Sequence, residues 1–383
     1  MKLLRVIRSL DPRFGGPSEH IRQITPLLQA QGIDTTVVCL DDPGDPWLTS
    51  GPAAIALGPG RGTYGYAPGV IAELTALARS HDLLMIDGLW QFHGLAARRA
   101  AQRLALPYVV CVHGMLDPWF GRRYPLKHLK KLAYWPWAEY RILRDARLVF
   151  FTTELERDLA RRSFWPYAAR EQVVSYGTEP PPDAAAAQRQ AFLTAHPDLE
   201  GKRVLLFLGR IHPKKGTDLL IRAFAHHAGR DPRLQLVIAG PDGVGWQRQL
   251  VDLAQQLGIA TRITWTGMLH GERKWGALRA AELFCLPSHQ ENFGIAVTEA
   301  LACGVPVLLG QPVNIAAAVE QAGAGIVHPD TTAGTTAALG QWLGSPASSH
   351  QTMAERAREL FERQFELSRT AQALAAALLP VAP

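Results

Sequence analysis

Short, continuous apolar runs alternate with stretches rich in helix-forming residues along the first half of the chain. The apolar runs predict strands at residues 3–10, 35–40, 82–87, 108–114 and 147–153. The stretches between them, such as 69–80 and 94–105, are rich in alanine, leucine, glutamate and arginine. Continuous apolar strands that alternate with helices indicate a parallel sheet covered on both faces.

The second half repeats this pattern. Its strand candidates are residues 203–210, 234–240, 262–267, 282–288, 305–310 and 324–329. Three consecutive prolines (180–182) and an alanine run occur between the halves, and they are typical of a linker. The sequence therefore predicts two doubly wound, Rossmann-like α/β domains, at 1–178 and 201–365, joined by a linker at 179–200 and facing a central cleft.

Composition agrees with two globular domains. The chain has 383 residues, of which 47% are hydrophobic and 19% charged, and a formal net charge of +6. This charge is too small to indicate nucleic-acid binding by itself. The four cysteines form no C-x-x-C pair, so we expect neither a zinc site nor disulfides, and we expect a reducing compartment. Charges interrupt the N-terminal apolar residues, and no apolar run approaches the ~20 residues of a membrane span, so a cytoplasmic location is expected.

Ligands of such sheets bind beyond the carboxyl ends of the strands, where glycines and charges follow three predicted strands. Gly15 and Gly16 form a turn before a helix, which lets the backbone approach an anion, although an ordinary strand-to-helix turn explains two glycines equally well. In the second half, Arg210 and Lys215 flank a proline-bearing loop before Gly216. Two fixed cations beside a helix N-terminus suit a diphosphate, while a solvated loop is the alternative for the lysine.

The stretch from Glu291 to Val307 follows another predicted strand. Gly294 is placed at a helix start, Ile295 follows it, and Glu299 lies about one turn further into an apolar helix. We interpret Glu291 as a ligand of sugar hydroxyls and Glu299 as a ligand of ribose. The alternative for Glu291 is a solvated acid favoured by the helix dipole, whereas a half-buried Glu299 needs a hydroxyl or cation partner.

Two further strand ends carry polar residues in the first half. His113 follows one strand, and we expect either a core histidine or a side chain that faces the reacting sugar. Asp87, Trp90 and His93 follow the preceding strand and are expected to shape an acceptor pocket.

Basic and aromatic residues are concentrated between residues 119 and 144. The basic residues are Arg122, Arg123, Lys127, Lys130 and Lys131, and the aromatic ones are Trp119, Phe120, Tyr124, Tyr134, Trp135 and Trp137. This mixture suits anionic lipid headgroups. A helix with a solvated basic face and a nucleic-acid-binding surface are the alternatives.

Taken in order, these residues resemble the retaining GT-B glycosyltransferases of glycosyltransferase family 4. The motifs that match are Gly15-Gly16, His113-Gly114, Gly209-Arg210 with Lys215-Gly216, residues 266–269, 286–307 and 322–330. The E-x7-E element with its flanks is specific, whereas the glycine pair alone is weak.

This resemblance implies two Rossmann-like domains, with the first binding the acceptor and residues 366–383 packing back on it. It also implies a nucleotide-sugar donor on the second domain. Arg210 and Lys215 would stabilise the departing diphosphate, Glu291 and the backbone of Asn292, Phe293 and Gly294 would contact the donor sugar, and Glu299 would bind ribose. The Gly16 amide would assist after domain closure, and His113 would lie near the anomeric centre.

The sequence lacks a D-x-D motif and departs from the family pattern in two loops. Without that motif, and with two cations that replace a metal's charge, no metal or other cofactor is expected. Tyr176, Thr178 and Glu179 stand where the family has a polar and acidic turn. Asn314 and Ile315 replace a glycine-rich stretch and are candidates to approach the nucleotide.

The leading hypothesis is a glycosyltransferase that moves a hexose-type sugar from a UDP- or GDP-sugar to a lipid-linked saccharide in surface or exopolysaccharide assembly. It would act at the cytoplasmic membrane face, without nucleic acid. A GT-B-fold epimerase, which needs no acceptor, and an inactive nucleotide-sugar-binding module are the alternatives.

Overall fold

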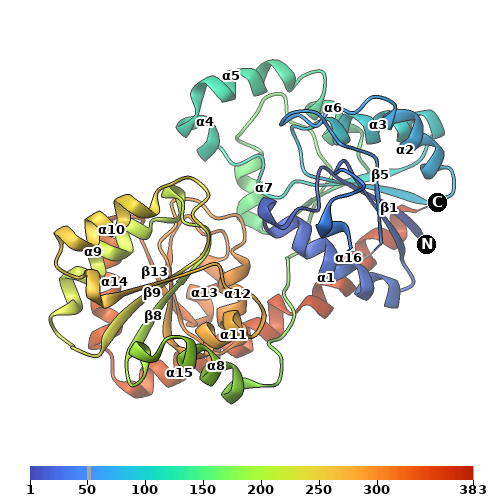
Figure 1. Ribbon diagram of the computed structural model, residues 1–383. Coiled ribbons are helices and arrows are strands. Elements are labelled where there is room, and N and C mark those ends of the chain that lie inside the picture. Colours follow the sequence, from blue (N-terminus) through green and yellow to red (C-terminus); the bar gives the residue numbers. More distant parts are fainter. Residues whose placement is uncertain (50–52, 383) are drawn as a thin grey trace. The chain divides into compact units, whose positions relative to one another are not determined.

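The computed structural model describes residues 1–49 and 53–382, and it divides into two compact units. Unit 1 comprises Met1–Gly177 with Leu367–Pro383, and unit 2 comprises Thr178–Glu366. Each unit has its own parallel sheet with helices against it (Figure 1). None of the described helices combines the length and the apolar character that a membrane span requires.

The sheet of unit 1 has seven strands in the order β3-β2-β1-β4-β5-β6-β7. Their bounds are β1 Lys2–Ile7, β2 Asp34–Cys39, β3 Ala54–Ala56, β4 Leu83–Asp87, β5 Tyr108–Cys111, β6 Leu148–Phe151 and β7 Glu171–Val173. The five strands predicted from apolar runs are all present. The edge strands β3 and β7 were not predicted, because each has three residues and none of them is fully buried.

The strand order of unit 1 reverses at β1, which pairs with β2 on one side and β4 on the other. Val6 lies opposite Val38 and Ile86, and Ile7 lies opposite Asp87. The carboxyl ends of β1 and β4 therefore meet at one edge of the sheet, where polar residues follow the buried ones.

Helices pack against this sheet and make up much of the remainder of unit 1. They are α1 Gly16–Ala30, α2 Val70–Ala78, α3 Phe92–Leu104, α4 Trp119–Arg123, α5 Pro125–Tyr134, α6 Glu139–Asp145, α7 Glu154–Ala160 and α16 Leu367–Leu378. The last of these runs beside α1 (Figure 1). Leu374 and Leu378 of α16 join Leu3 and Ile24 in one buried cluster, so the C-terminal segment is part of the core of unit 1.

Unit 2 has six strands in the order β10-β9-β8-β11-β12-β13. Their bounds are β8 Arg203–Leu208, β9 Leu234–Ala239, β10 Ile263–Gly267, β11 Ala281–Leu286, β12 Val307–Gly310 and β13 Gly325–His328. All six strand candidates of the second half are present, and the order reverses at β8, which pairs with β9 and β11. These two doubly wound parallel sheets confirm the predicted fold class.

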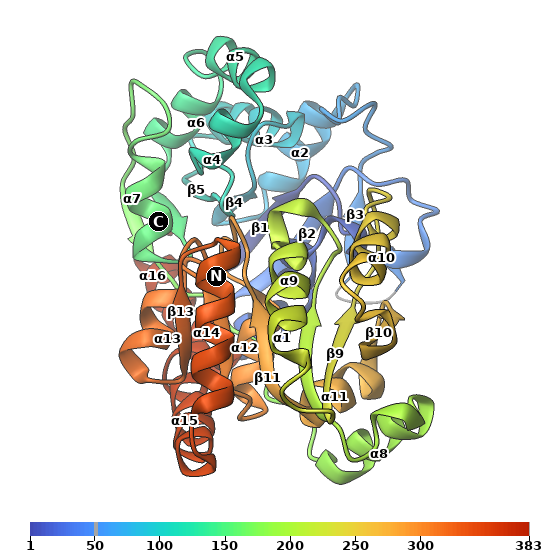
Figure 2. The ribbon, with the colours of Figure 1, turned by 90° about the vertical axis from the view of Figure 1, so that its left-hand side faces the viewer.

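The helices of unit 2 include one inside the segment predicted as a linker. They are α8 Ala185–Ala195, α9 Thr217–Ala228, α10 Gln247–Gln256, α11 Gly271–Ala280, α12 Ile295–Ala302, α13 Ala316–Ala322, α14 Thr332–Gly344 and α15 Ala347–Leu360. Helix α8 lies against α11 (Figure 2). A Cβ added to Gly276 would lie 2.2 Å from the backbone oxygen of Gln188, so the alanine run is a packed helix of unit 2.

Candidate functional site

Unit 2 presents a group of cations beyond the carboxyl end of β8. Arg210 is exposed after the strand, and Lys214 and Lys215 lie in the short 3-10 helix that precedes α9. Gly216 has a left-handed φ of 65°, and a Cβ there would lie 2.1 Å from the backbone oxygen of Pro287. Only glycine fits this approach, which brings the start of α9 against the end of β11.

Lys215 and Glu291 form an ion pair across this approach. Burial of Glu291 opposes ionisation, yet Lys215, Lys214 and Arg210 together hold its pKa below the ordinary value. The sequence assigned Lys215 to the diphosphate and Glu291 to the sugar as separate contacts. The structure shows that they are partners, so a bound ligand must share or exchange their charges.

Glu299 is also already paired. It lies in α12, is 7% exposed, and accepts a hydrogen bond from Lys274 Nζ at 2.6 Å. The sequence predicted that the Glu299 carboxylate needs a hydroxyl or cation partner, and Lys274 is that partner. The sequence did not single out Lys274, because nothing in the pattern of α11 indicates that it faces α12.

The loop that begins at Glu291 is fixed by backbone and amide contacts. Asn314 donates its amide to Asn292 Oδ1 at 3.2 Å, and its backbone N–H donates to the Glu291 carbonyl oxygen at 3.0 Å. Gly294 has a left-handed φ of 85° and precedes Ile295, the first residue of α12. Phe293 is 3% exposed and packs on Phe365, so its side chain belongs to the core.

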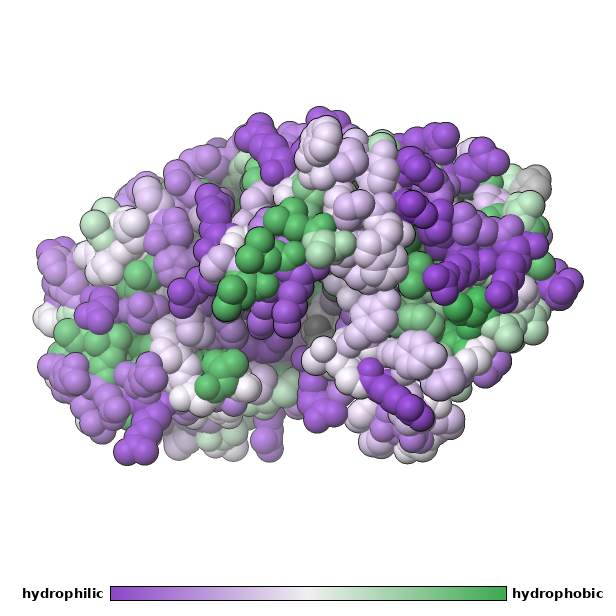
Figure 3. Space-filling model, turned by 90° about the horizontal axis from the view of Figure 1, so that it is seen from above, coloured by the Kyte–Doolittle hydropathy of each residue, from purple (hydrophilic) through white to green (hydrophobic). Residues whose placement is uncertain are grey.

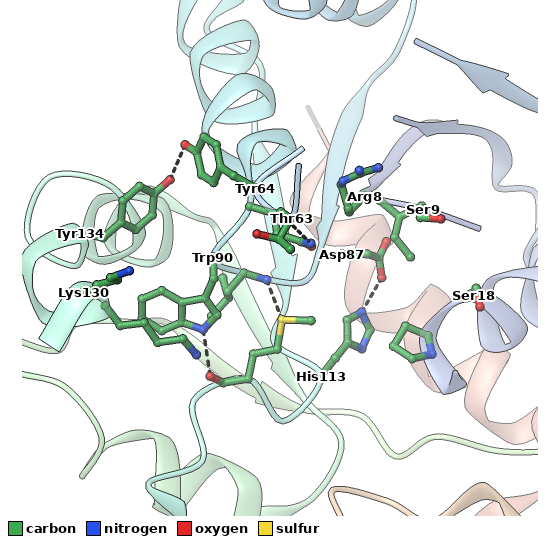
Figure 4. A pocket seen from close by; sticks show the side chains of 16 residues that line it. Arg8, Ser9, Ser18, Thr63, Tyr64, Asp87, Trp90, His113, Lys130 and Tyr134 are labelled. Carbon is green, nitrogen blue, oxygen red and sulfur yellow. Dashed lines mark hydrogen bonds and ion pairs between the residues drawn. The ribbon is translucent and has the colours of Figure 1, made fainter. Parts of the chain in front are cut away.

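Unit 1 contains a cavity of about 590 Å³ at the carboxyl edge of its sheet. Gly15, with a left-handed φ of 95°, and Gly16 lead into α1 beside the lining residues Pro17 and Ser18. Figure 4 shows Asp87 and His113 facing one another on one side of this cavity and the bonded hydroxyls of Tyr64 and Tyr134 on the other.

A buried network surrounds Asp87. Its carboxylate accepts hydrogen bonds from Arg5 Nε and Nη2 at 2.7 and 2.9 Å, and from His113 Nε2 at 2.8 Å. Burial would raise the pKa of this carboxyl, but Arg5 holds it well below its usual range. Tyr176 OH bonds the other ring nitrogen of His113, and His20 stacks on Tyr176 with ring centroids 3.9 Å apart.

This network limits what His113 does as a side chain. A carboxylate only accepts hydrogen bonds, so Nε2 donates to Asp87 and, in the neutral ring, Nδ1 accepts from Tyr176. The sequence left His113 as either a core histidine or a side chain that faces the reacting sugar, and the structure shows both of its ring nitrogens engaged in unit 1. His93 is a core histidine, fully buried and bonded to the Asp87 carbonyl oxygen at 2.8 Å.

Asp87, Cys111 and His113 place one possible ligand atom each within 4.8 Å of one another. A divalent cation does not suit this group. Arg5 already adds a positive charge on Asp87, and burial raises the pKa of the Cys111 thiol well above its usual value.

Trp90 lines the cavity and has a strained backbone. Its φ is 71°, a costly conformation for a bulky residue, and its N–H donates to Glu139 Oε1 at 2.6 Å. Glu139 is 1% exposed, and burial raises its pKa to about 8. The sequence gave no signal for this carboxyl, which lies 49 residues away along the chain.

The basic and aromatic segment contains α4, α5 and most of α6, and the chain turns between the first two at Tyr124, before Pro125. Arg122, Arg123, Lys127 and Lys130 are exposed and Lys131 is half-buried; Lys130 and Lys131 both line the cavity. Trp135 is in the core, and Trp137 is exposed.

Helix α5 also exposes three leucines that the sequence did not single out. Leu126, Leu129 and Leu132 are 77%, 61% and 40% exposed. Hydrophobic side chains gather over α4 and α5 in Figure 3. An amphipathic helix with exposed leucines and cations is the type of surface that binds at a lipid interface.

Comparisons with known proteins match both units. The family described as "Glycosyl transferases group 1" matches residues 188–360, and the "Glycosyl transferase 4-like domain" matches residues 15–177. The chain belongs to the group 1 glycosyltransferases. This group 1 member is 36% identical over 221 residues to a D-inositol 3-phosphate glycosyltransferase of Nocardia farcinica, a match that covers 54% of this chain and 47% of the relative. The chain spans about half the length of the curated relatives it matches.

Solved structures show the same fold as this group 1 chain. Sucrose-phosphate synthase from Thermosynechococcus elongatus aligns with a TM-score of 0.78 and 22% identity, covering 98% of each chain. Anabaena HepE in complex with UDP and glucose aligns with a TM-score of 0.78 and 19% identity, covering 99% of each chain. These likenesses establish the GT-B fold predicted from the sequence.

The raised pKa of Glu139 should make the stability of unit 1 depend on pH. Its pKa is raised in the folded state, so its contribution is fully present below about pH 4.3 and is lost as pH rises toward about 8. Glu139→Gln keeps the acceptor for Trp90 and removes this titration. Across this range we expect the protection of β4 and β5 amides, measured by native-state hydrogen exchange, to fall in the wild type by up to roughly 5 kcal/mol more than in the variant.

Glu73→Gln, an exposed change on α2, serves as the control and keeps the wild-type profile. If Glu139→Gln follows the wild-type decline, Glu139 is ionised in the folded protein and the assignment is wrong.

Proposed function

We propose that this chain transfers a hexose-type sugar from a UDP- or GDP-sugar to an acceptor, with retention of configuration and without a metal. Unit 2 would bind the donor, and unit 1 would bind the acceptor. The observation that carries the proposal is the group of Arg210, Lys214 and Lys215 between β8 and α9, with Lys215 paired to Glu291 in the loop after β11.

The chemistry of a sugar nucleotide explains why these charges lie together. Negative charge develops on the diphosphate as the glycosidic bond breaks, and fixed cations stabilise it without a metal. Because Lys215 holds Glu291, the ammonium would move toward phosphate while the carboxylate turns to sugar hydroxyls. Glu299, held by Lys274, would accept ribose hydroxyls in the same way.

The names of similar proteins support a nucleotide-sugar donor. HepE from Anabaena has been solved with UDP, with UDP and glucose, and with UDP-glucose. The curated relatives act, by name, on D-inositol 3-phosphate, and another neighbour is a sucrose-phosphate synthase. We propose a UDP- or GDP-sugar for this chain on the same chemistry, with Asn314 and Ile315 beside the nucleotide.

Donor binding is tested by thermal stabilisation with a panel of nucleoside diphosphates. We expect UDP or GDP to raise the melting temperature of unit 2 specifically. Arg210→Ala and Lys215→Ala should abolish this shift and lower sugar transfer about 100-fold or more. Lys202→Ala, an exposed change in the same unit, should behave as wild type.

The Arg210→Ala variant is expected to fold like wild type, because the Arg210 side chain is exposed and forms no ion pair with the residues that the structure describes. Its loss of activity would therefore report on ligand binding and not on folding. A normal nucleotide shift and normal transfer in Arg210→Ala would refute the diphosphate assignment.

We also propose that the acceptor is a lipid-linked saccharide of surface or exopolysaccharide assembly, reached at the cytoplasmic face of a membrane. The exposed leucines and cations of α4 and α5 support an anionic lipid surface over a purely solvated helix.

Membrane binding is tested by neutralising Arg122, Arg123, Lys127 and Lys130 together. Each cation contributes on the order of 1 kcal/mol near an anionic surface, so sedimentation with phosphatidylglycerol vesicles should fall at least tenfold. Arg79→Gln with Arg103→Gln, two exposed changes elsewhere in unit 1, is the control. Equal vesicle binding by wild type and the four-residue variant would return this surface to the solvated-helix alternative.

A further inference from the structure

The cavity of unit 1 carries more positive charge than its acids neutralise. Arg8, Lys130 and Lys131 line it, and Asp87 is the one acid among the described lining residues. Arg5 donates to both oxygens of Asp87, so the positive charge of Arg5 already neutralises that carboxylate. The three lining cations are therefore not compensated by this acid.

Lys131 is half-buried against aromatic rings. Its ammonium lies 4.3 Å from the ring centre of Trp90 and 5.8 Å from that of Phe120. It forms no ion pair with the residues that the structure describes. Burial lowers its pKa to about 8, so it remains mostly charged at neutral pH. Glu139 attracts it electrostatically but forms no ion pair with it, and burial favours the protonated form of that acid.

Arg8 is held in place but keeps its charge. Its guanidinium donates to the backbone oxygens of Leu40 and Gly60 at 3.0 and 3.1 Å. Carbonyl dipoles orient a guanidinium without cancelling its charge, so an anion in the cavity would meet a fixed cation on this side as well.

The rest of the wall suits the ring of a sugar. Tyr64 and Tyr134 join through their hydroxyls at 2.8 Å, and Trp90 is anchored by donating Nε1–H to the Met115 carbonyl oxygen at 3.0 Å. A volume of about 590 Å³ is in the range of small-molecule sites. Fixed aromatic faces with hydroxyl groups beside uncompensated cations fit a ligand with both a ring and an anion.

We propose that this cavity binds an acceptor that carries a phosphate group, and that Lys131 recognises the charge of that group. A half-buried cation beside aromatic rings gains most from a charged hydrogen-bond acceptor, and a phosphate group is one in both its monoester and its diester form. The proposal rests on the function proposed above, because it identifies the ligand of unit 1 as the acceptor. The phosphate has two possible sources, a soluble sugar phosphate or the phosphate that joins a saccharide to a lipid.

Calorimetric titration of the full chain distinguishes these sources. The probes are glucose 6-phosphate, glucose, and dihexanoyl phosphatidylglycerol dispersed below its micelle concentration. We expect one of the two phosphate probes to bind about tenfold or more tightly than glucose, since a charge-assisted hydrogen bond contributes at least this factor. Lys131→Met should remove the advantage, and Lys131→Arg should retain most of it.

Lys2→Met removes an exposed lysine at the opposite end of β1 and should bind the phosphate probe within about twofold of wild type. UDP and GDP binding should be the same in every variant, which separates this test from that of the donor site. A melting curve checks that Lys131→Met is folded, and Lys131→Gln replaces it if it is not.

The proposal is overturned if neither phosphate probe binds better than glucose, or if the variant without the Lys131 ammonium keeps the preference. Failure of wild type to bind any nucleotide would instead count against the donor site in unit 2.

Discussion

Parallel strand order places the carboxyl ends of all strands at one edge of each sheet, and both candidate sites depend on this constraint. In unit 1 it brings Arg5 of β1 beside Asp87 of β4, as a buried ion pair with little exposed surface. In unit 2 it brings the loop after β8 against the end of β11, where Lys215 meets Glu291. Removing one partner of such a pair would leave an uncompensated buried charge, which is destabilising. Each charged residue at these edges therefore depends on its partner.

The carboxylates of unit 2 are bound to lysines, which changes how a donor would enter. Lys215 and Lys274 each hold one glutamate, so neither Glu291 nor Glu299 is an isolated acid waiting for a ligand. A diphosphate offers the lysines a stronger partner and releases carboxylate oxygens to hydroxyl groups. This exchange describes binding residues, and it gives no role for either glutamate as a nucleophile.

The sequence predicted the fold well because long apolar strands carry a strong periodic signal. It also indicated the strand ends at which Asp87, His113, Arg210 and Glu291 lie, since those residues directly follow buried runs. It missed β3 and β7, whose three residues are too few to form a pattern. It also interpreted the alanine run of α8 as a linker, because composition alone does not show that Gly276 lets that helix approach.

The hydrophobic pattern of the sequence did not predict contacts between side chains that are distant along the chain. Tyr176 was noted only as a departure from a family turn, yet it bonds His113 across 63 residues. Glu139 and Lys274 act through Trp90 and Glu299, and their neighbours in sequence give no sign of these contacts. Three-dimensional pairing, not local composition, decides which charges remain available to a ligand.

Hydrogen exchange with and without UDP or GDP tests the donor site most directly. We expect slower exchange for the amides of residues 209–217 and 290–299 when the nucleotide binds, and unchanged exchange for residues 87–91 at the cavity of unit 1. Protection confined to the segments of unit 1, or absent from both segments of unit 2, would contradict this expectation.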